Sequence, residues 1–338
     1  MNKQKIAVIG GTGFVGINLC LYLKKKNHDV YAIDSMMKKI GLHEQIAKLE
    51  NKSINIIKSD IVNSDEIEEI LLKIKPDVIV NLAAQVSFKK SVEDPFLDFQ
   101  INLLGTLNIL EVIRKRLHNS KFIYASTNQV YGELAHHKTI EKETRFDFVD
   151  LELGISENEK LDFLSPYGCS KGAADQYVLD YARVYGLDTC VLRLGGIYGV
   201  NQYAIEDHGW VSYISKMVLD NKSFNRFGHG KQVRDILYVS DICEAFYLAI
   251  INDLSDKERL YNIGGGKDNS ISVLELLAKL EKITGNKERS IINPMRQADK
   301  LVSYLDISRA KKNLNWKPKI SIENGLSKLV SWLNTVSF

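Results

Sequence analysis

The sequence is poor in cysteine, and none of its cysteines form a closely spaced pair. Cys20, Cys169, Cys190 and Cys243 lie far apart in 338 residues, with no C-x-x-C motif. This spacing argues against a disulfide framework. Three of the four fall inside apolar patterns, so we expect reduced, mostly buried thiols in a reducing compartment.

The chain also lacks a strong net charge and a long apolar run. It has 45 Lys and Arg against 42 Asp and Glu, a formal net charge of +3, which argues against a dedicated nucleic-acid surface. No apolar run approaches the ~20 residues that span a bilayer. Glycines interrupt the first apolar run at once, unlike a signal peptide. We expect a cytoplasmic protein that binds neither membrane nor nucleic acid.

Short runs rich in Val and Ile alternate with amphipathic stretches. Hydrophobic residues make up 45% of the chain, enough for a large core. Runs that are apolar throughout are typical of parallel strands covered on both faces. The pattern predicts a doubly wound, Rossmann-type α/β sheet. The expected strands are residues 5–10, 29–34, 54–59, 77–83, 121–127 and 189–194.

The regular alternation of apolar runs and amphipathic stretches ends after about residue 194. Glycine-rich loops follow, mixed with shorter helices at 272–284 and 322–334. This predicts a smaller α/β lobe toward the C-terminus. Residues 235–250 look like a strand and helix that return to the first domain, so we expect the two lobes to be interleaved. The predicted division is 1–193 plus 235–258 for the nucleotide-binding domain, and 194–234 plus 259–338 for the second lobe.

The sequence "GGTGFVG" follows the first strand and opens a helix. It satisfies G-x-G-x-x-G, in which glycines permit a tight turn and let a pyrophosphate approach backbone N–H groups. A glycine pattern alone is weak evidence, but the order strand, turn, helix strengthens it. We expect a dinucleotide to lie against Gly10, Gly13, Phe14, Val15 and Gly16.

Asp34 ends the second strand, 34 − 16 = 18 residues after the last glycine. This is close to the ~20 expected for the acid that binds the adenosine ribose. A carboxylate there would repel a 2′-phosphate, so the pattern favours NAD over NADP; capping of the turn before Ser35 is the simpler alternative. Ligands gather at the carboxyl ends of parallel strands, so we expect further cofactor contacts from Ser35, Asp60, Ile61, Leu82, Ala83 and Ala84. For the alanines, core packing explains the pattern equally well.

Tyr167 and Lys171 are four residues apart and therefore project from one helix face. Ser165 is a plausible N-cap with Pro166 at the first helical position. A tyrosine pKa near ~10 makes a poor base unless a cation and the helix N-terminus stabilise the phenolate. Tyr-x-x-x-Lys is common by chance, but its place after a dinucleotide motif favours a catalytic pair.

Ser126 and Thr127 end the fifth strand, where a hydroxyl could share the substrate's proton with Tyr167. A strand-end turn would explain a Ser-Thr run equally well. With these elements the chain resembles, over essentially its whole length, the extended short-chain dehydrogenases/reductases of the nucleotide-sugar epimerase and dehydratase group. The motifs that carry the resemblance are "GGTGFVG", "NLAAQ", "INLLGTLN", "YASTNQVYG", "SPYGCSK", "LRLGGIYG" and "GKQVRDILYVSDI".

The resemblance implies an NAD-dependent enzyme that acts on a nucleotide-diphosphate sugar. By position, Thr127 matches the catalytic hydroxyl, Tyr167 the acid/base and Lys171 the ribose-binding lysine. Asn102 matches an asparagine that supports this lysine, and Gln85 of "NLAAQ" is placed with the cofactor. The implied substrate contacts are Ser87, Ser126, Thr127, Asn128, Gly196, Asn201, Gln202, Arg234 and Arg296. For the two arginines, surface ion pairs with Asp235 and Asp299 would be the alternative from sequence alone.

The residues after Thr127 restrict the reaction. Hexose 4,6-dehydratases have an Asp-Glu pair there, whereas this chain has Asn128 and Gln129, and amides cannot exchange the required protons. The stretches "LDFLSPYGCSKGAADQYVLDYARVYGLDT", "NQYAIEDHGWV" and "GHGKQVRDIL" resemble the CDP-paratose 2-epimerase (CDP-tyvelose epimerase) subgroup. This implies C2 epimerisation of a CDP-dideoxyhexose through a transient keto sugar. A 4-epimerase of the UDP-glucose type is the alternative, and a non-catalytic NAD-binding protein a more distant one.

Several residues depart from the family pattern around the expected sugar site. Asn201-Gln202 replaces an Arg-Gln, Gly196 replaces an asparagine or serine, and His208 replaces a glutamine. We expect Gly195-Gly196 to enlarge the sugar site. His136 and His137 adjoin without a correctly spaced third ligand, so no metal site is expected. The resemblance also implies a homodimer or higher oligomer, formed through helices within residues 101–115 and 173–185.

Overall fold

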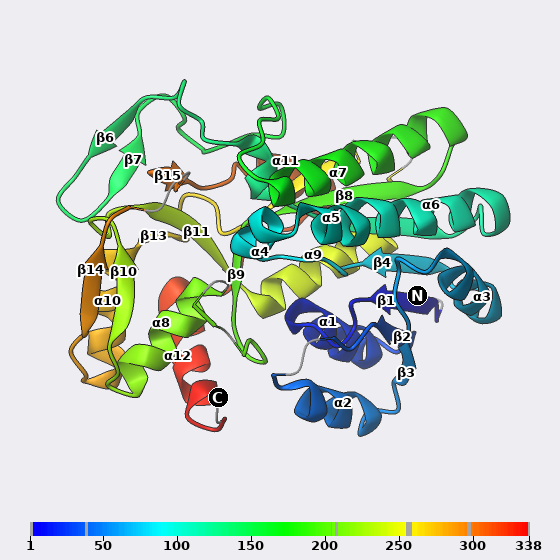
Figure 1. The fold of residues 1–338 in the computed structure, drawn as a ribbon, viewed down its shortest axis with the longest axis horizontal. Coiled ribbons are helices and arrows are strands. Elements are labelled where there is room, and N and C mark those ends of the chain that lie inside the picture. The colour runs from blue at the N-terminus through cyan, green and yellow to red at the C-terminus, as the bar shows by residue number, and fades with distance from the viewer. Residues whose placement is uncertain are drawn as a thin grey trace.

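The protein is built around a seven-stranded parallel sheet with helices on both faces (Figure 1). A computed structural model describes residues 3–37, 40–203, 205–206, 209–254, 259–295 and 299–336. In spatial order the strands are β12 (Leu260–Ile263), β8 (Thr189–Leu194), β5 (Lys121–Thr127), β4 (Val78–Asn81), β1 (Lys5–Ile9), β2 (Asp29–Asp34) and β3 (Asn55–Lys58). The chain order reverses between β1 and β4, where ligands bind in doubly wound folds.

The six predicted strands are confirmed, as β1, β2, β3, β4, β5 and β8. All residues of β4 and β5 are buried, which explains their uninterrupted apolar runs. The seventh strand differs from the prediction. β12 pairs in parallel with β8, so residues 260–263 belong to the main sheet, although the predicted division assigns residue 259 onward to the second lobe.

Two hydrophobic clusters fill the two faces of the sheet. Helices α1 (Phe14–Lys25) and α9 (Val239–Ile251) contribute to one cluster, which continues into the second lobe. Helices α3 (Ser64–Ile74), α6 (Gly105–Arg116) and α7 (Pro166–Tyr185) contribute to the other. Helix α2 (Leu42–Glu50) packs against β3 and α1. The central parallel strands are thereby covered on both sides, as the sequence pattern predicts, whereas the edge strand β3 stays partly exposed.

A continuous helical run, Pro95–Arg116, precedes β5. It consists of α5 (Pro95–Phe99), a π-helical turn η1 (Gln100–Leu104) and α6, after the short helix α4 (Phe88–Glu93). By length and composition it could cross a membrane, but 44% of its most apolar window is buried inside the protein, and it packs against α3 and α7. We therefore assign it to the core.

The smaller lobe lies at the left of Figure 1 and is built from short strands and helices. Its strands are β9 (Gly196–Tyr198), β10 (Phe224–Phe227), β11 (Val233–Tyr238), β13 (Ser270–Ser272), β14 (Ser290–Asn293) and β15 (Val302–Ser303). Its helices are α8 (Trp210–Leu219), α10 (Val273–Thr284) and α12 (Ile322–Leu333). The hairpin β6 (Thr139–Glu141) and β7 (Phe146–Phe148) borders the lobe, and α11 (Ser308–Leu314) packs on β12.

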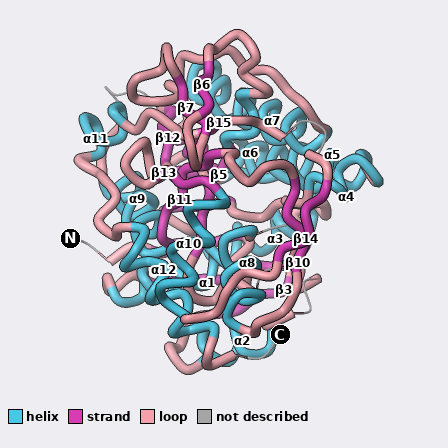
Figure 2. The backbone as a smooth tube through the Cα atoms, turned by 90° about the vertical axis from the view of Figure 1, so that its left-hand side faces the viewer, coloured by secondary structure: helices cyan, strands magenta, loops and turns pink. Residues whose placement is uncertain are grey.

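The second lobe has its own sheets. β10 and β14 run side by side (Figure 2), and β11 pairs with β9, β13 and β15. The predicted return of residues 235–250 to the first domain therefore holds only for α9, which packs on α1 and β5. β11 pairs only with strands of the second lobe in the described part of the chain.

Candidate active site

The glycine turn between β1 and α1 is tightly packed on one side and open on the other. Gly10 has φ +80° and donates its N–H to the Ile33 carbonyl oxygen at 2.8 Å. A Cβ on Gly16 would lie 2.0 Å from the Gly10 carbonyl oxygen, whereas a Cβ on Gly13 would meet only that oxygen, at 3.2 Å. Space above Gly13 is what an approaching pyrophosphate needs, so the turn fits a dinucleotide.

These two glycines should respond differently to alanine. We expect Gly16→Ala to lower the melting temperature or prevent folding, because its Cβ would overlap backbone. Gly13→Ala should fold normally yet bind NAD about tenfold more weakly or worse, about 1.4 kcal/mol. Thermal denaturation and calorimetric titration with NAD measure the two effects. Undiminished NAD affinity in Gly13→Ala would contradict the placement of the pyrophosphate.

The contacts of Asp34 are compatible with both predicted roles, a turn cap and an acid that binds a ribose. Its carboxylate accepts the N–H of Met36 at 2.8 Å, as a turn cap does, and the N–H of Thr12 in the glycine turn at 3.0 Å. An ionised carboxylate has about four acceptor sites, so two remain for ribose hydroxyls. Asp34 therefore fixes the glycine turn and retains acceptor sites for a further ligand.

The other predicted cofactor contacts gather at the same carboxyl edge. Phe14 and Val15 begin α1, and Ser35 follows β2. The side chain of Asp60 accepts the N–H of Val62 at 3.0 Å in the turn after β3, next to Ile61. Leu82, Ala83 and Ala84 follow β4, and the Ala83 nitrogen would lie 2.7 Å from a Cβ on Gly10. The carboxyl ends of four neighbouring strands, β4, β1, β2 and β3, thus lie along one edge of the sheet.

Helix α7 presents Tyr167 and Lys171 in its first two turns. The side-chain oxygen of Ser165 accepts the N–H of Gly168 at 3.1 Å, and Pro166 occupies the first helical position, which confirms the predicted cap. Burial raises the pKa of Tyr167 to about 12, and a hydrogen bond with the Thr127 side chain partly offsets this. Tyr167 and Thr127 are thus in contact, so the strand end and the helix start form one site.

Lys171 is buried beneath this pair. Its ammonium group donates to the Ala125 carbonyl oxygen at 2.6 Å and lies 4.2 Å from the centre of the Tyr124 ring. Burial lowers its pKa to about 7, against the opposing charges of Asp175 and Asp98. An ammonium has three N–H donors, so Lys171 can also bind hydroxyl groups such as those of a ribose.

Asn102 supports the site in a way that the resemblance does not specify. Its amide donates to the Ser170 hydroxyl and to Asp98, both at 3.1 Å, and its carbonyl oxygen accepts the N–H of Gln85 at 2.9 Å. It therefore positions the residue before Lys171 rather than Lys171 itself. The π-helical turn that carries Asn102 is a feature often found at functional sites.

Asp98 is a supporting residue that sequence reasoning missed. It is fully buried and accepts hydrogen bonds from Gln85, Asn102 and Ser170. The available signal was its spacing, four residues before Asn102 on one helix face. Buried carboxylates require such partners, so Asp98 orders the helices on both sides of the tyrosine.

Ser126 and Thr127 end β5, and their side chains contact different residues of α7. The Ser126 hydroxyl donates to Asp175 at 2.8 Å. Asp175 in turn accepts two bonds from Arg193, at 2.8 and 3.0 Å. The predicted substrate contact of Ser126 is therefore replaced by a buried ion-pair network, and Thr127 alone faces Tyr167.

The expectation that Gly195 and Gly196 enlarge the sugar site is wrong. A Cβ on Gly195 would lie 2.9 Å from both carboxylate oxygens of Asp235, and one on Gly196 would lie 2.7 Å from its carbonyl oxygen. The space is filled by the buried Asp235, whose pKa burial raises to about 7. These glycines therefore accommodate β11.

Other predicted sugar contacts hold loops in place. Asn201 donates to the Asn18 side chain at 3.1 Å and accepts from Lys48 at 2.6 Å, so its side chain faces α1 and α2. Gln202 bonds to the Ile197 carbonyl oxygen and the Ser212 hydroxyl. Ser87 caps α4 by accepting the Lys90 N–H at 3.2 Å. These side chains anchor the walls of the site.

The structure describes two more of the predicted substrate contacts, Arg234 and Asn128. Arg234 lies on β11, pairs with Asp299 and is 20% exposed in its side chain. Asn128 begins a 3₁₀ turn, η2 (Asn128–Tyr131), directly after Thr127. Its carbonyl oxygen accepts a hydrogen bond from Lys300, a buried residue that sequence reasoning missed. Arg296 and His208 lie outside the described residues.

The fold brings a third side chain to His136 and His137. Both imidazoles contact Glu159, at 3.1 and 2.9 Å, and His137 also contacts Asp150 at 3.0 Å. The ligand atoms of His136, His137 and Glu159 lie within 4.8 Å of one another. Burial lowers the pKa of His137, but its two carboxylate contacts outweigh this and raise it. We interpret the cluster as ion pairs that join two loops.

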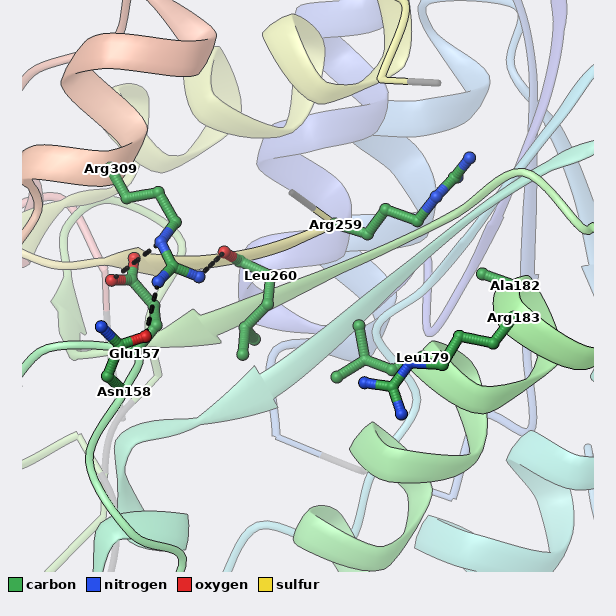
Figure 3. Close-up of a pocket in the computed structure, with 8 residues that line it drawn as sticks. All are labelled: Glu157, Asn158, Leu179, Ala182, Arg183, Arg259, Leu260 and Arg309. Carbon is green, nitrogen blue, oxygen red and sulfur yellow. Dashed lines mark hydrogen bonds and ion pairs between the residues drawn. The ribbon is translucent and has the colours of Figure 1, made fainter. Parts of the chain in front are cut away.

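A cavity of about 520 Å³ lies beside the C-terminal half of α7 (Figure 3). Leu179 and Arg183 of α7, Leu260 and Arg309 contribute to its lining. In Figure 3 Arg309 turns to Glu157 and to the Leu260 carbonyl oxygen. Leu179 is twelve residues from Tyr167, about 18 Å along a helix, and no predicted site residue lines the cavity. It is separate from the catalytic groups.

Comparisons with known proteins agree with this geometry. The family model described as GDP-mannose 4,6 dehydratase matches residues 7–329. CDP-paratose 2-epimerase of Salmonella typhi is 38% identical over 98% of this chain and 100% of its own length.

Two solved structures share the fold. The UDP-glucose 4-epimerase of Thermotoga maritima, solved with UDP-glucose, is 30% identical with a TM-score of 0.85, covering 98% of this chain and 99% of its own. The UDP-glucose 4-epimerase of Thermus thermophilus, solved with NAD, is 28% identical with a TM-score of 0.84, covering 98% and 100%. The likeness thus extends over both lobes.

Proposed function

This chain belongs to the extended short-chain dehydrogenase/reductase family of NAD-dependent nucleotide-sugar epimerases and dehydratases, and we propose that it inverts C2 of a CDP-dideoxyhexose, of the CDP-paratose and CDP-tyvelose type. As an enzyme it is an NAD-dependent nucleotide-sugar epimerase, an isomerase. The observation that carries the proposed substrate is the 38% identity to a CDP-paratose 2-epimerase over the full length of that protein.

Dehydration is disfavoured by the residues that follow Thr127. Asn128 and Gln129 begin η2 and stand where the dehydratases have an acid and a base. An amide neither donates nor accepts a proton at neutral pH in the way that a carboxyl group does. The family model carries a dehydratase description, but these two amides separate the present chain from that reaction.

The residues of the glycine turn fit NAD. Gly13 leaves room for a pyrophosphate, Asp34 has free acceptor sites for a ribose, and Lys171 has free donors beneath Tyr167. When bound, NAD supplies the acceptor and donor of a hydride. The protein's task is to hold both ligands, to exclude water and to move one proton.

Tyr167 is the group that moves this proton. In our proposal it takes the proton of the C2 hydroxyl as the keto sugar forms and returns a proton when the alcohol is restored. Thr127, in contact with Tyr167, shares the hydrogen bond. Because burial raises the pKa of Tyr167 to about 12, a protonated Lys171 one helical turn away is needed to favour the phenolate. Between the two steps the sugar must present its opposite face.

The reaction can be tested with labelled substrate. The protein is incubated with CDP-paratose carrying deuterium at C2, without added reduced cofactor, and the products are identified by NMR. We expect CDP-tyvelose that retains the deuterium at C2, because the hydride is returned within one active site. Conversion of UDP-glucose at C4, with no change in CDP-paratose, would instead assign the protein as a 4-epimerase.

That 4-epimerase activity is the second candidate, supported by the 30% identity to the Thermotoga maritima enzyme. It would use the same Tyr167, Lys171 and Thr127, with the sugar placed differently. Side chains that face the sugar therefore decide between C2 and C4 chemistry, and the catalytic groups do not.

We further propose a homodimer formed through α4, α5 and α7, which pack together. Large apolar side chains are exposed on this face: Val92 (57%), Phe96 (75%), Phe99 (45%), Tyr177 (43%) and Val184 (61%). Large exposed apolar side chains on helices that pack together are typical of a protein interface. Helix α7 contains the range 173–185 that the family resemblance implies, whereas the other implied range, 101–115, lies in η1 and α6.

Phe96→Glu is expected to convert the dimer to a monomer, because a carboxylate would be desolvated at the centre of the interface. Light scattering after size-exclusion chromatography measures the mass. Ile292→Glu is the matched control, since Ile292 is 67% exposed on β14 in the other lobe. A wild-type mass equal to that of one chain would refute the dimer.

We also place the protein in the cytoplasm. All four cysteines are free; Cys20, Cys190 and Cys243 are buried and Cys169 is exposed, as the sequence pattern predicts. An exposed free thiol is compatible with a reducing compartment.

A further inference from the structure

Lys300 is a buried lysine whose charge has no ion-pair partner among the residues that the structure describes. The residue is 4% exposed, and its ammonium group donates to the Asn128 carbonyl oxygen at 3.4 Å. Within the described residues it forms no ion pair with a carboxylate. A buried ammonium without a carboxylate contact is costly in free energy, so the position calls for a ligand.

The surroundings place this charge between two parts of the substrate site. Asn128 follows Thr127, which contacts Tyr167. Arg234 lies on the other side, and β11 pairs with β15 just after Lys300, with Arg234 opposite Ser303. Lys300 therefore lies between the group that reacts with the sugar and the arginine expected to bind the diphosphate.

The charge balance favours a phosphate over a neutral sugar hydroxyl. Lys300 and Arg234 are both cations, and the Arg234 charge acts on Lys300. Asp299 is already paired with Arg234, and Asp162 is exposed. A diphosphate brings about two negative charges, which would satisfy both cations.

We propose that Lys300 binds the phosphate that carries the sugar. The inference rests on the proposed function only in that the substrate is a nucleotide-diphosphate sugar. Arg234 fixes the diphosphate from the β11 side. Lys300, next to Asn128, holds the sugar-linked phosphate close to Thr127 and Tyr167.

The charge state of Lys300 supplies a second readout. Burial, together with the nearby charge of Arg234, lowers the pKa of Lys300 to about 7. The charges of Asp299 and Asp162 act in the opposite direction. Asn128 contributes a neutral carbonyl oxygen. Because a bound phosphate favours the ammonium form, its affinity is full below the pKa of the free protein and falls as pH rises through about 7.

The test compares nucleotides with and without the second phosphate. CDP and CMP, and UDP and UMP, are titrated calorimetrically into the NAD-loaded wild type, Lys300→Met and Lys121→Met. Lys121 is the matched control, since it is also buried, 8% exposed, but bonds to carbonyl oxygens of residues 250 and 252.

We expect Lys300→Met to weaken diphosphate binding about 10- to 100-fold and to leave monophosphate binding nearly unchanged. In this variant the affinity for diphosphates should no longer fall as pH rises through about 7. Lys121→Met should leave the affinities for monophosphates and diphosphates unchanged. Since methionine removes a buried charge, Lys300→Met should melt at or above the wild-type temperature.

Three results would overturn the inference. Equal weakening of mono- and diphosphates would indicate a structural role. Unchanged CDP and UDP affinity, with weakening of the nucleotide sugar alone, would move the contact to the sugar. A pH dependence that persists in Lys300→Met would belong to another group. None of these measurements requires turnover, so failure of the C2 reaction remains a separate result.

Discussion

Tyr167→Phe is expected to lower kcat by about 10²- to 10⁴-fold, the usual contribution of a positioned acid/base. Phenylalanine keeps the ring and its packing but cannot exchange the substrate proton. The fold should persist, because the lost hydroxyl contacts Thr127 and is not part of the buried Asp98 network. NAD and nucleotide affinities, measured by calorimetry, should stay within about twofold of wild type, since the ring bonds to neither phosphate nor ribose in our proposal.

Tyr177→Phe is the matched control for this variant. Tyr177 lies on the same helix, is 43% exposed and belongs to the proposed dimer face. It should leave kcat unchanged in the dimer. Normal turnover by Tyr167→Phe would remove the tyrosine from the chemistry, and loss of NAD binding would make the kinetic result uninformative about proton transfer.

Asp175→Asn is expected to destabilise the protein by about 3–5 kcal/mol, the effect of breaking a buried ion pair from one side. Asp175 is fully buried, and its two oxygens bind Arg193, which is 2% exposed, and Ser126. The amide would leave the guanidinium charge uncompensated. For a chain of this length the change corresponds to a drop in melting temperature of about 4–7 °C.

Two further variants test the origin of that effect. Asp175→Leu combined with Arg193→Met removes both charges and should recover much of the loss, since paired charges replaced by apolar groups are often nearly neutral. Glu111→Gln removes a half-exposed carboxylate that pairs with Arg114 and should change stability by less than about 1 kcal/mol. If Asp175→Asn and Glu111→Gln lowered the free energy of unfolding equally, burial of the Asp175–Arg193 ion pair would not explain the effect.

The same substitution should also affect catalysis. Asp175 is the main charge that opposes the lowering of the Lys171 pKa. Without it, the ammonium form of Lys171 would be lost at a lower pH, so the activity that depends on this cation should decline earlier as pH rises. Asp175 is thus a positioning residue, because it acts through Lys171 and Arg193.

Much of the fold could be predicted because the relevant signals are local. Apolar runs specified six strands of the main sheet, the glycine turn followed β1, and Ser165-Pro166 marked the start of α7. β12 was missed because its four residues precede a glycine run that reads as a loop. β11 was placed in the wrong lobe because strand pairing depends on distant partners, here β9, β13 and β15.

The sequence by itself determined the residue types and spacings of the reaction: the glycine turn, Asp34, Thr127, and Tyr167 with Lys171 one helical turn later. Only the tertiary structure decided which neighbouring groups share an environment. It turned Ser126 toward Asp175, filled the space at Gly195 and Gly196 with Asp235, and brought Lys300 beside Asn128. Local spacing follows from helix and strand geometry, whereas burial and charge balance depend on contacts between distant segments: 31 residues separate Gly266 from Asp235, 49 separate Ser126 from Asp175 and 172 separate Lys300 from Asn128.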